Sequence, residues 1–200
     1  MKKNIFSFAF ILLLLSSSSF GQKYAYKHDG FFLRMLAGPG YAELVDKDVM
    51  GSDLKFSSLG TATRFQIGGV ISENLIIYGE FGGVGQLQPK VEWMGETTTV
   101  GRLSVFVYDF GGGITYYLMP VNVYFSFSLY TSGAALEYFG GEYESGSGFG
   151  LNAMIGKEWW ISYDWALGAA IYGYYSTMEE ERGFTINNFS VGVLFSATYN

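Results

Sequence analysis

Cysteine is absent from this 200-residue chain, and proline and histidine are rare, with three residues and one residue respectively. The lack of cysteine excludes a disulfide framework, a thiolate metal site and a lipid anchor on a cysteine behind a signal peptide. Long apolar runs are also missing, because no segment beyond residue 21 is continuously apolar for the roughly 20 residues of a membrane helix. Half-apolar strands must therefore carry the hydrophobicity of a chain that is 49% hydrophobic and 19% aromatic.

The first 21 residues have the pattern of a secretory signal peptide. Lys2 and Lys3 precede an apolar run over residues 5–15, and small residues lead to a cleavage site after Gly21. The remaining residues, 22–200, have the length of one domain. Removing the two lysines from the 12 basic residues leaves 10 against 18 acidic ones. This negative charge argues against nucleic acid as a partner.

Polar gaps of two different lengths separate the apolar segments of the mature chain. The short gaps are 72–74, 118–122 and 160–164, and the long gaps are 41–60, 83–102, 131–147 and 177–187. Long loops on one rim and tight turns on the other are typical of a bacterial transmembrane β-barrel.

The segments between the gaps have the length and the alternation of membrane-spanning strands. A tilted strand needs about ten residues to cross an apolar band of about 25 Å. In one segment, Val123, Phe125 and Phe127 alternate with polar residues, which is the period of a strand. We therefore predict an all-β fold, an eight-stranded antiparallel up-and-down transmembrane β-barrel. Its strands are expected at 31–40, 61–71, 75–82, 103–117, 123–130, 148–159, 165–176 and 188–199.

Four charged residues inside the predicted strands indicate which face is the lumen. A cation facing the bilayer midplane costs about 2 to 4 kcal/mol, so Arg34 and Arg64 should point inward, together with Glu80 and Asp109. This assignment turns apolar side chains outward on all four strands. Buried charges are tolerated when they are paired. We expect these four residues, whose charges sum to zero, to form a lumenal ion-pair network that plugs the barrel, helped by Gln66, Tyr78 and Tyr124.

An even number of strands returns both termini to the rim with short turns, which is the periplasmic rim of such barrels. The long loops then face the outside of the cell. Aromatic residues cluster near the short turns, where amphipathic rings suit the lipid headgroups. The expected periplasmic aromatic girdle consists of Tyr116, Tyr117, Trp159, Trp160 and Trp165.

The last predicted strand resembles the C-terminal insertion signal of known outer-membrane barrels. Ser190, Gly192, Phe195 and Tyr199 follow its pattern, with Tyr199 and Asn200 in place of the usual terminal phenylalanine. The chain thus resembles the small eight-stranded families of outer membrane proteins A, W and X. This resemblance implies a monomer in the outer membrane of a Gram-negative-type bacterium. Its implied partners are membrane lipid, lipopolysaccharide and the barrel assembly machinery.

A catalytic role is not expected. Barrel enzymes that modify lipid A, as a family, use a histidine with a serine or acid near the outer leaflet. The single histidine, His28, precedes the first strand and should be an exposed residue on the periplasmic rim. We predict no catalytic, cofactor-binding or metal-binding residues. The acids of the long loops could hold divalent cations that bridge to lipopolysaccharide, although a solvated rim explains them more simply.

Three functions remain open at this point. The first is a structural or surface-interaction role through the four extracellular loops, with an unknown surface ligand. The second is a channel or carrier for small, hydrophobic molecules, as the resemblance to the outer membrane protein W type implies. Phe32, Leu36 and Ile76 on the inward face keep this second function open. The third is a lipid-modifying barrel enzyme.

Overall fold

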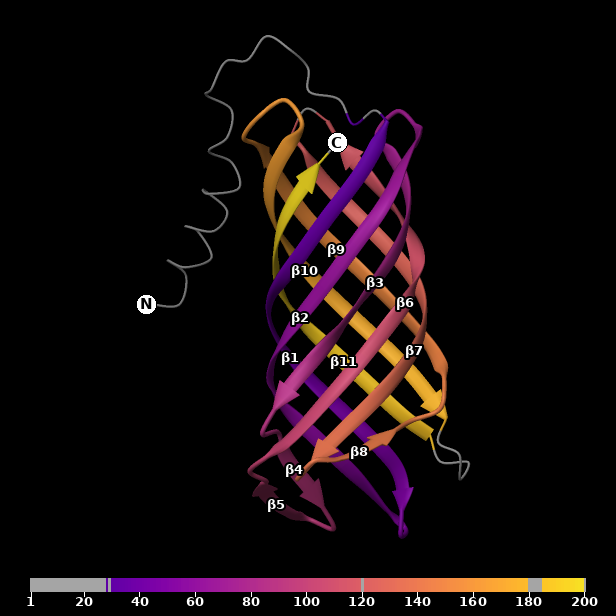
Figure 1. Cartoon of the computed structure of the whole chain (residues 1–200), viewed down its shortest axis with the longest axis vertical. Helices are drawn as coiled ribbons and strands as arrows, with labels where there is room; N and C mark the ends of the chain where they lie inside the picture. The colour runs from indigo at the N-terminus through magenta and orange to yellow at the C-terminus, as the bar shows by residue number, and fades with distance from the viewer. Residues whose placement is uncertain (1–27, 29, 120, 180–184, 200) are drawn as a thin grey trace, which may run out of the picture.

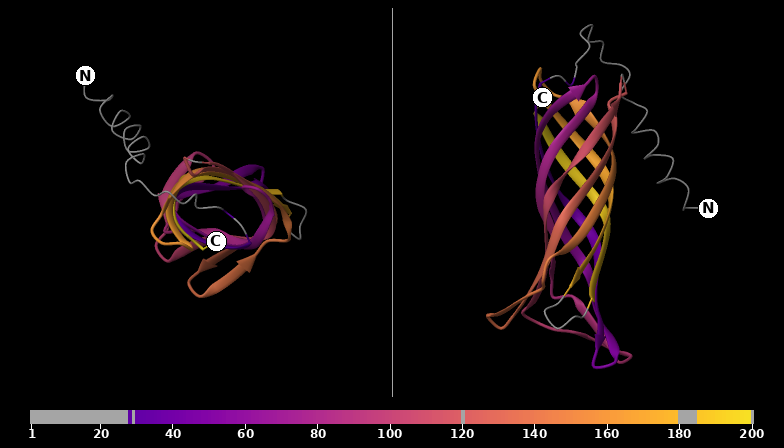
Figure 2. Two further views of the ribbon diagram at one scale, coloured as in Figure 1. Left: turned by 90° about the horizontal axis from the view of Figure 1, so that it is seen from above. Right: turned by 90° about the vertical axis from the view of Figure 1, so that its right-hand side faces the viewer.

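Long, tilted strands form one closed cylinder in the computed structural model (Figure 1), and the view along its axis shows the ring (Figure 2). The structure describes residues 28, 30–119, 121–179 and 185–199. The expected signal peptide lies outside these ranges. Within them, no helix is long and apolar enough to cross a membrane.

Every strand of the ring is antiparallel to its neighbours, and β1 closes the ring by pairing with both β2 and β11. The predicted eight-stranded up-and-down barrel is therefore confirmed. The ring consists of β1 (Phe31–Val49), β2 (Ser52–Ser72), β3 (Leu75–Leu87), β6 (Leu103–Leu118), β7 (Val123–Tyr138), β9 (Gly148–Trp160), β10 (Trp165–Glu179) and β11 (Thr185–Tyr199).

Several strands run much further than the sequence pattern predicts. The gap 41–60 is not an irregular loop, because β1 and β2 remain paired as far as Val49 and Ser52. Met50 and Gly51 join them with positive φ angles of 52° and 83°, as a two-residue type I′ hairpin turn requires. Three short strands extend the same end of the barrel: β4 (Lys90–Trp93), β5 (Glu96–Thr99) and β8 (Gly141–Glu144).

The physical reason for this difference lies in the outward face. Along the outer part of β1, Ala42 and Leu44 stay buried while Glu43 and Lys47 alternate with them. A strand that has left the membrane can carry charge on its outer face and still pack its inner face. A prediction that requires apolar residues at the outward positions therefore places the end of each strand too early. We call this extended end the long-loop end and the opposite one the short-turn end.

The exterior of the cylinder carries an apolar band bounded by aromatic residues. On β1 this band runs from Phe31 to Tyr41, which matches the about ten residues needed to span about 25 Å. Tyr108 and Tyr175 lie exposed toward the long-loop end. The Tyr175 hydroxyl donates a hydrogen bond to Asn187 Oδ1 at 3.1 Å, so its polar tip is satisfied outside the band.

Glycines opposite tyrosines let large rings lie against the inner wall. Tyr124 on β7 faces Gly156 on β9, and Tyr78 on β3 faces Gly113 on β6. A Cβ on Gly156 would lie 2.5 Å from Tyr124 Cζ, a distance that no side chain tolerates. Glycine is thus required at this close approach, and the lumen is filled mainly by aromatic rings and the groups they contact.

Candidate functional site in the barrel lumen

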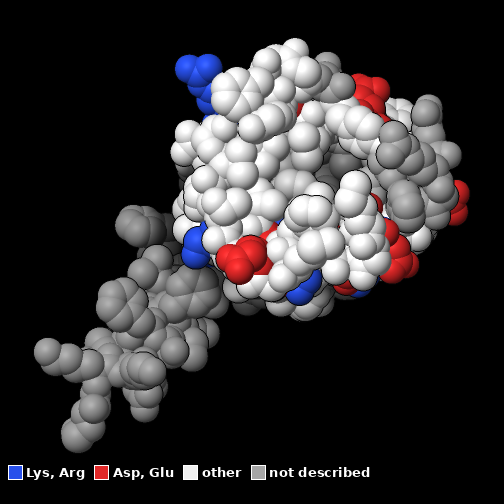
Figure 3. All heavy atoms as spheres, turned by 90° about the horizontal axis from the view of Figure 1, so that it is seen from below, with Lys and Arg blue, Asp and Glu red and all other residues white. Residues whose placement is uncertain are grey.

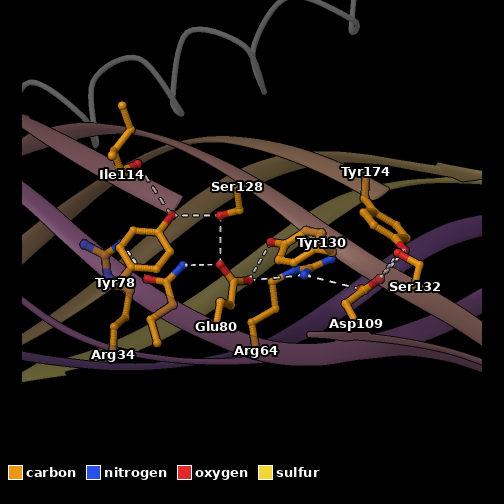
Figure 4. Close-up of polar contacts among 11 residues, drawn as sticks. Arg34, Arg64, Tyr78, Glu80, Asp109, Ile114, Ser128, Tyr130, Ser132 and Tyr174 are labelled. Atoms are coloured by element: carbon orange, nitrogen blue, oxygen red, sulfur yellow. Dashed lines mark hydrogen bonds and ion pairs between the residues drawn. The ribbon is translucent and has the colours of Figure 1, made fainter. Parts of the chain in front are cut away.

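Glu80 is the centre of a buried polar cluster midway along the lumen (Figure 4). Arg64 Nη1 lies 3.1 Å from Glu80 Oε1, and the Tyr130 hydroxyl donates to the same oxygen at 2.8 Å. Gln66 Nε2 at 3.0 Å and the Ser128 hydroxyl at 2.9 Å donate to Oε2. Four donors from β2 and β7 therefore compensate the cost of burying this carboxylate.

Arg64 joins this carboxylate to a second one. Its Nη1 lies 3.5 Å from Asp109 Oδ2, while Asp109 Oδ1 accepts hydrogen bonds from Tyr174 and, at 2.8 Å, from Ser132. The guanidinium lies over the rings of Tyr130 and Tyr174, at 5.1 and 5.0 Å from their centroids. The structure thus brings together three of the four predicted network residues, Arg64, Glu80 and Asp109.

The fourth predicted residue, Arg34, pairs with neither of those acids. Its Nε lies 3.1 Å from Glu158 Oε1, and it reaches Glu80 only through Gln66, whose Oε1 accepts from Nη1 at 3.2 Å. Tyr117 also accepts a hydrogen bond from Arg34 and donates one to Glu158 at 2.9 Å. Arg34 therefore heads a second cluster nearer the short-turn end.

Glu158 is a network residue that the sequence reading did not assign to the lumen. It lies on β9 two residues beyond Gly156 and so on the same inward face of that strand. Continuing the alternation from Gly156 to the next inward position would have identified Glu158 as a lumenal residue. With Glu158 included, two arginines face three carboxylates, so the formal charge of the lumenal network is −1 rather than zero.

Two residues that the sequence analysis placed on the surface are buried at the short-turn end. His28 is buried, not exposed: its Nε2 lies 3.0 Å from Asn122 Oδ1, and its ring stacks on Tyr117 with centroids 3.5 Å apart. Tyr117 itself is fully buried and does not belong to an exterior girdle. The expectation failed for Tyr117 because a neighbouring aromatic pair, Tyr116 and Tyr117, necessarily divides between the two faces of a strand. It failed for His28 because its ring stacks on the inward-facing Tyr117.

The other residues predicted for this rim lie on or near the exterior. Tyr116 and Trp165 are exposed, whereas Trp159 and Trp160 are partly buried. Trp165 packs edge-on against Tyr199 with ring centroids 5.4 Å apart. Their role in a girdle stays a prediction.

The residues of the expected insertion signal divide between the two faces of β11. Phe195 is exposed outside, Ser190 is buried in the lumen, and Gly192 lies opposite Tyr172. The function of this motif as an insertion signal stays a prediction.

The long-loop end of the lumen differs in character. A cavity of about 210 Å³ opens there, and Figure 3 shows a hollow surrounded mainly by uncharged side chains. Phe32, Leu36 and Ile76 do not line this cavity. They are buried elsewhere in the lumen, with Phe32 against Tyr78 at 6.0 Å between ring centroids. The cavity is lined mostly by apolar residues: Leu44, Leu54, Phe56, Val105, Ala134, Ala135, Leu136 and Ile186, with Asp46, Tyr143 and Ser145.

Acidic side chains are more numerous than basic ones around this opening. Lys47 Nζ lies 2.5 Å from Asp53 Oδ2 near the tip of the β1–β2 hairpin. This hydrogen bond lowers the pKa of Asp53 and raises the pKa of Lys47. Among the described residues, no group of three or more histidines or acids could hold a metal ion. The exposed acids are Asp48, Glu92, Glu96, Glu137, Glu144 and Glu179.

Comparison with known proteins shows the fold. No protein-family model and no curated protein matches the chain. Neisserial surface protein A shares 16% identity at a TM-score of 0.50, over 83% of this chain and 96% of that one. The outer membrane protein OprG from Pseudomonas aeruginosa shares 9% identity at a TM-score of 0.51, over 88% and 100%. The outer membrane protease OmpT from Escherichia coli shares 8% identity at a TM-score of 0.44, over 92% and 99%. The chain has the fold of a small outer-membrane β-barrel.

Proposed function

We propose that this chain is an integral outer-membrane protein whose closed barrel anchors an ordered β-surface outside the cell. The observation that carries the proposal is the continuation of β1, β2 and β7 past the apolar band, where β1 and β2 stay paired with each other, β2 also pairs with β4, and β7 pairs with β8. Paired backbone presents side chains in fixed positions, which suits surface interaction better than an irregular loop does. The short-turn end is then periplasmic, and lipopolysaccharide surrounds the long-loop end.

Site-directed labelling tests this orientation directly, because the chain has no native cysteine. Met94→Cys, in the turn between β4 and β5, should react with a membrane-impermeant maleimide on intact cells. Glu73→Cys, in the turn between β2 and β3, is the matched control and should react only after the cells are broken. Labelling of Glu73→Cys alone on intact cells would overturn the proposal.

The closed lumen is the second part of the proposal. The Glu80 and Glu158 clusters, together with His28, support a barrel that passes no ions. We expect no stable openings in planar bilayers from the wild-type protein. Openings that occur in the wild type, and that Arg34→Ala and Glu80→Ala leave unchanged, would contradict the sealed lumen.

A second candidate function is the binding of a small apolar molecule at the long-loop end. The apolar cavity favours it, and its volume of about 210 Å³ exceeds the about 150 Å³ that suffices for benzene in an engineered apolar cavity. Passage through the whole barrel is not part of this proposal, because the polar clusters lie between the cavity and the short turns. Nor is catalysis, since His28 lies at the short-turn end, where it contacts Asn122 and Tyr117.

A further inference from the structure

Several buried polar atoms of the lumen have no hydrogen-bond partner, among them the Ser176 and Ser190 hydroxyls, and in two buried asparagines this holds for both atoms of the carboxamide. Asn152 on β9 is 0% exposed and Asn188 on β11 is 1% exposed, yet neither the amide nitrogen nor the amide oxygen of either residue has a hydrogen-bond partner. Leaving such groups unpaired costs the desolvation free energy that a hydrogen bond would otherwise offset. These side chains therefore offer unused donors and acceptors inside the barrel.

Asn188 directly adjoins the lining of the apolar cavity. It is the cross-strand partner of Leu44 on β1, and Ile186 lies two residues away on the same face of β11. Both of these neighbours line the cavity. Asn152 lies one inward-facing row deeper, because it is in register with Tyr174 whereas Asn188 is in register with Ser176. Of the two free carboxamides, Asn188 is thus the one next to the cavity.

The charge around the opening restricts the net charge that a ligand can carry. Exposed acids such as Asp48, Glu137 and Glu179 lie toward this end, and Figure 3 shows acidic side chains, with fewer basic ones, on the outer rim of this face. A field of this sign disfavours the entry of anions. The mostly apolar lining disfavours any ligand that keeps a full charge inside. An uncharged molecule meets both conditions.

We infer that the cavity and Asn188 form one binding site for a small uncharged molecule with an apolar body and a single hydrogen-bonding group. This inference rests on the second candidate function and adds the polar end of the ligand to it. The apolar body lies against Leu44, Phe56 and Ile186. Asn188 Nδ2 donates to a ligand carbonyl, or Oδ1 accepts from a ligand hydroxyl. A volume of about 210 Å³ suits a ligand of about ten non-hydrogen atoms.

Matched probes separate the apolar part of the site from the polar part. Acetophenone and isopropylbenzene have nearly the same shape, and only acetophenone can accept a hydrogen bond. Benzoate is the charged counterpart. We would titrate each probe into the protein in phospholipid nanodiscs and follow the methyl NMR signals of Leu44 and Ile186. Partition into lipid is the same for every variant, so affinity ratios between variants are the readout.

Three variants complete the design. Asn188→Leu removes the proposed polar contact, and Asn152→Leu is a matched control with the same chemical change one row deeper. Ala134→Phe fills the cavity, because Ala134 lines it. The shift in gel mobility between boiled and unboiled samples confirms that each variant still forms a barrel.

We expect acetophenone to bind the wild type, to lose about fivefold in affinity in Asn188→Leu, and to be unaffected by Asn152→Leu. Isopropylbenzene should bind Asn188→Leu at least as well as the wild type, Ala134→Phe should abolish both, and benzoate should not bind. If Asn188→Leu lowers the affinity for acetophenone and isopropylbenzene by the same factor, or leaves the affinity for acetophenone unchanged, the polar contact is overturned. The apolar site would remain. Failure of both uncharged probes to shift either methyl signal would overturn the apolar site itself.

Discussion

Both halves of the lumen are lined by alternate residues of the strands, but one half is filled by side chains and the other contains a cavity. Toward the short turns, long charged and aromatic side chains reach across the barrel and contact one another, as the four donors to Glu80 show. Toward the long loops, mostly shorter apolar residues leave a cavity, and Asn188 beside it has no partner. One half is filled by contacting polar and aromatic groups, and the other contains an apolar cavity.

This difference shows that the alternation of inward and outward side chains does not by itself decide whether a small barrel is sealed. Arg34 and Arg64 are long enough to meet acids on strands that are not their neighbours. Alanines such as Ala42 and Ala62 in the other half cannot do so. The length of the inward side chains, rather than the alternation along the strands, therefore determines whether a part of the lumen is filled or contains a cavity.

The largest expected effect comes from removing the centre of the plugged half. Glu80→Ala leaves the Arg64 charge and three further donors in the lumen without their acceptor, and we expect a loss of about 3 to 5 kcal/mol in the free energy of unfolding. Urea unfolding in lipid vesicles, followed by tryptophan fluorescence, measures it. Glu96→Ala, on exposed β5, is the control and should change stability by less than about 0.5 kcal/mol. Equal effects of the two variants would remove the distinction between the halves.

A smaller loss is expected from the open half. Leu44→Ala deletes buried methyl groups at the edge of the cavity, and we expect a cost of about 2 kcal/mol, the lower end of the range for such changes. The low value follows because Leu44 already borders empty space on one side. The same unfolding measurement checks it. A cost as large as that of Glu80→Ala would mean that the cavity wall is packed as tightly as the plug.

The coupling between Arg34 and Glu158 sharpens the comparison within the plugged half. We expect Arg34→Leu and Glu158→Leu together to cost at least about 1 kcal/mol less than the sum of the single changes, because each single change strands a buried charge. A double-mutant cycle of unfolding free energies gives this number. Strict additivity would show that the pair at 3.1 Å contributes nothing as a pair.

The smallest effect is expected at the hairpin tip, outside both halves. The lowered pKa of Asp53 means that its contact with Lys47 stabilises the tip above the unfolded value of about 4 and is lost as the pH falls through the folded value. The raised pKa of Lys47 means that the contact is complete below about 10.4 and is lost as the pH rises through the folded value. Amide exchange near Met50 should therefore differ slightly between wild type and Asp53→Asn at neutral pH, and not at pH extremes. A difference that persists in strong acid would contradict this assignment.

Much of the architecture could be predicted, and each failure has its own physical cause. Strand number and the inward direction of Arg34, Arg64, Glu80 and Asp109 follow from alternation and from the cost of charge in a bilayer. The extended hairpins were missed because a strand outside the membrane no longer needs an apolar outer face. Tyr117 was placed outside because a residue type that suits the headgroups also suits a lumenal stack, and His28 because it precedes the first strand.

Strand number, side-chain parity and a polar lumen are properties that the order of residues alone determines, because a period of two and a membrane of fixed thickness leave few alternatives. The partner of Arg34, the burial of His28 and the cavity beside Asn188 depend on how the closed ring is sheared. That shear decides which residues of non-adjacent strands meet across the lumen, and no pattern along a single strand contains it.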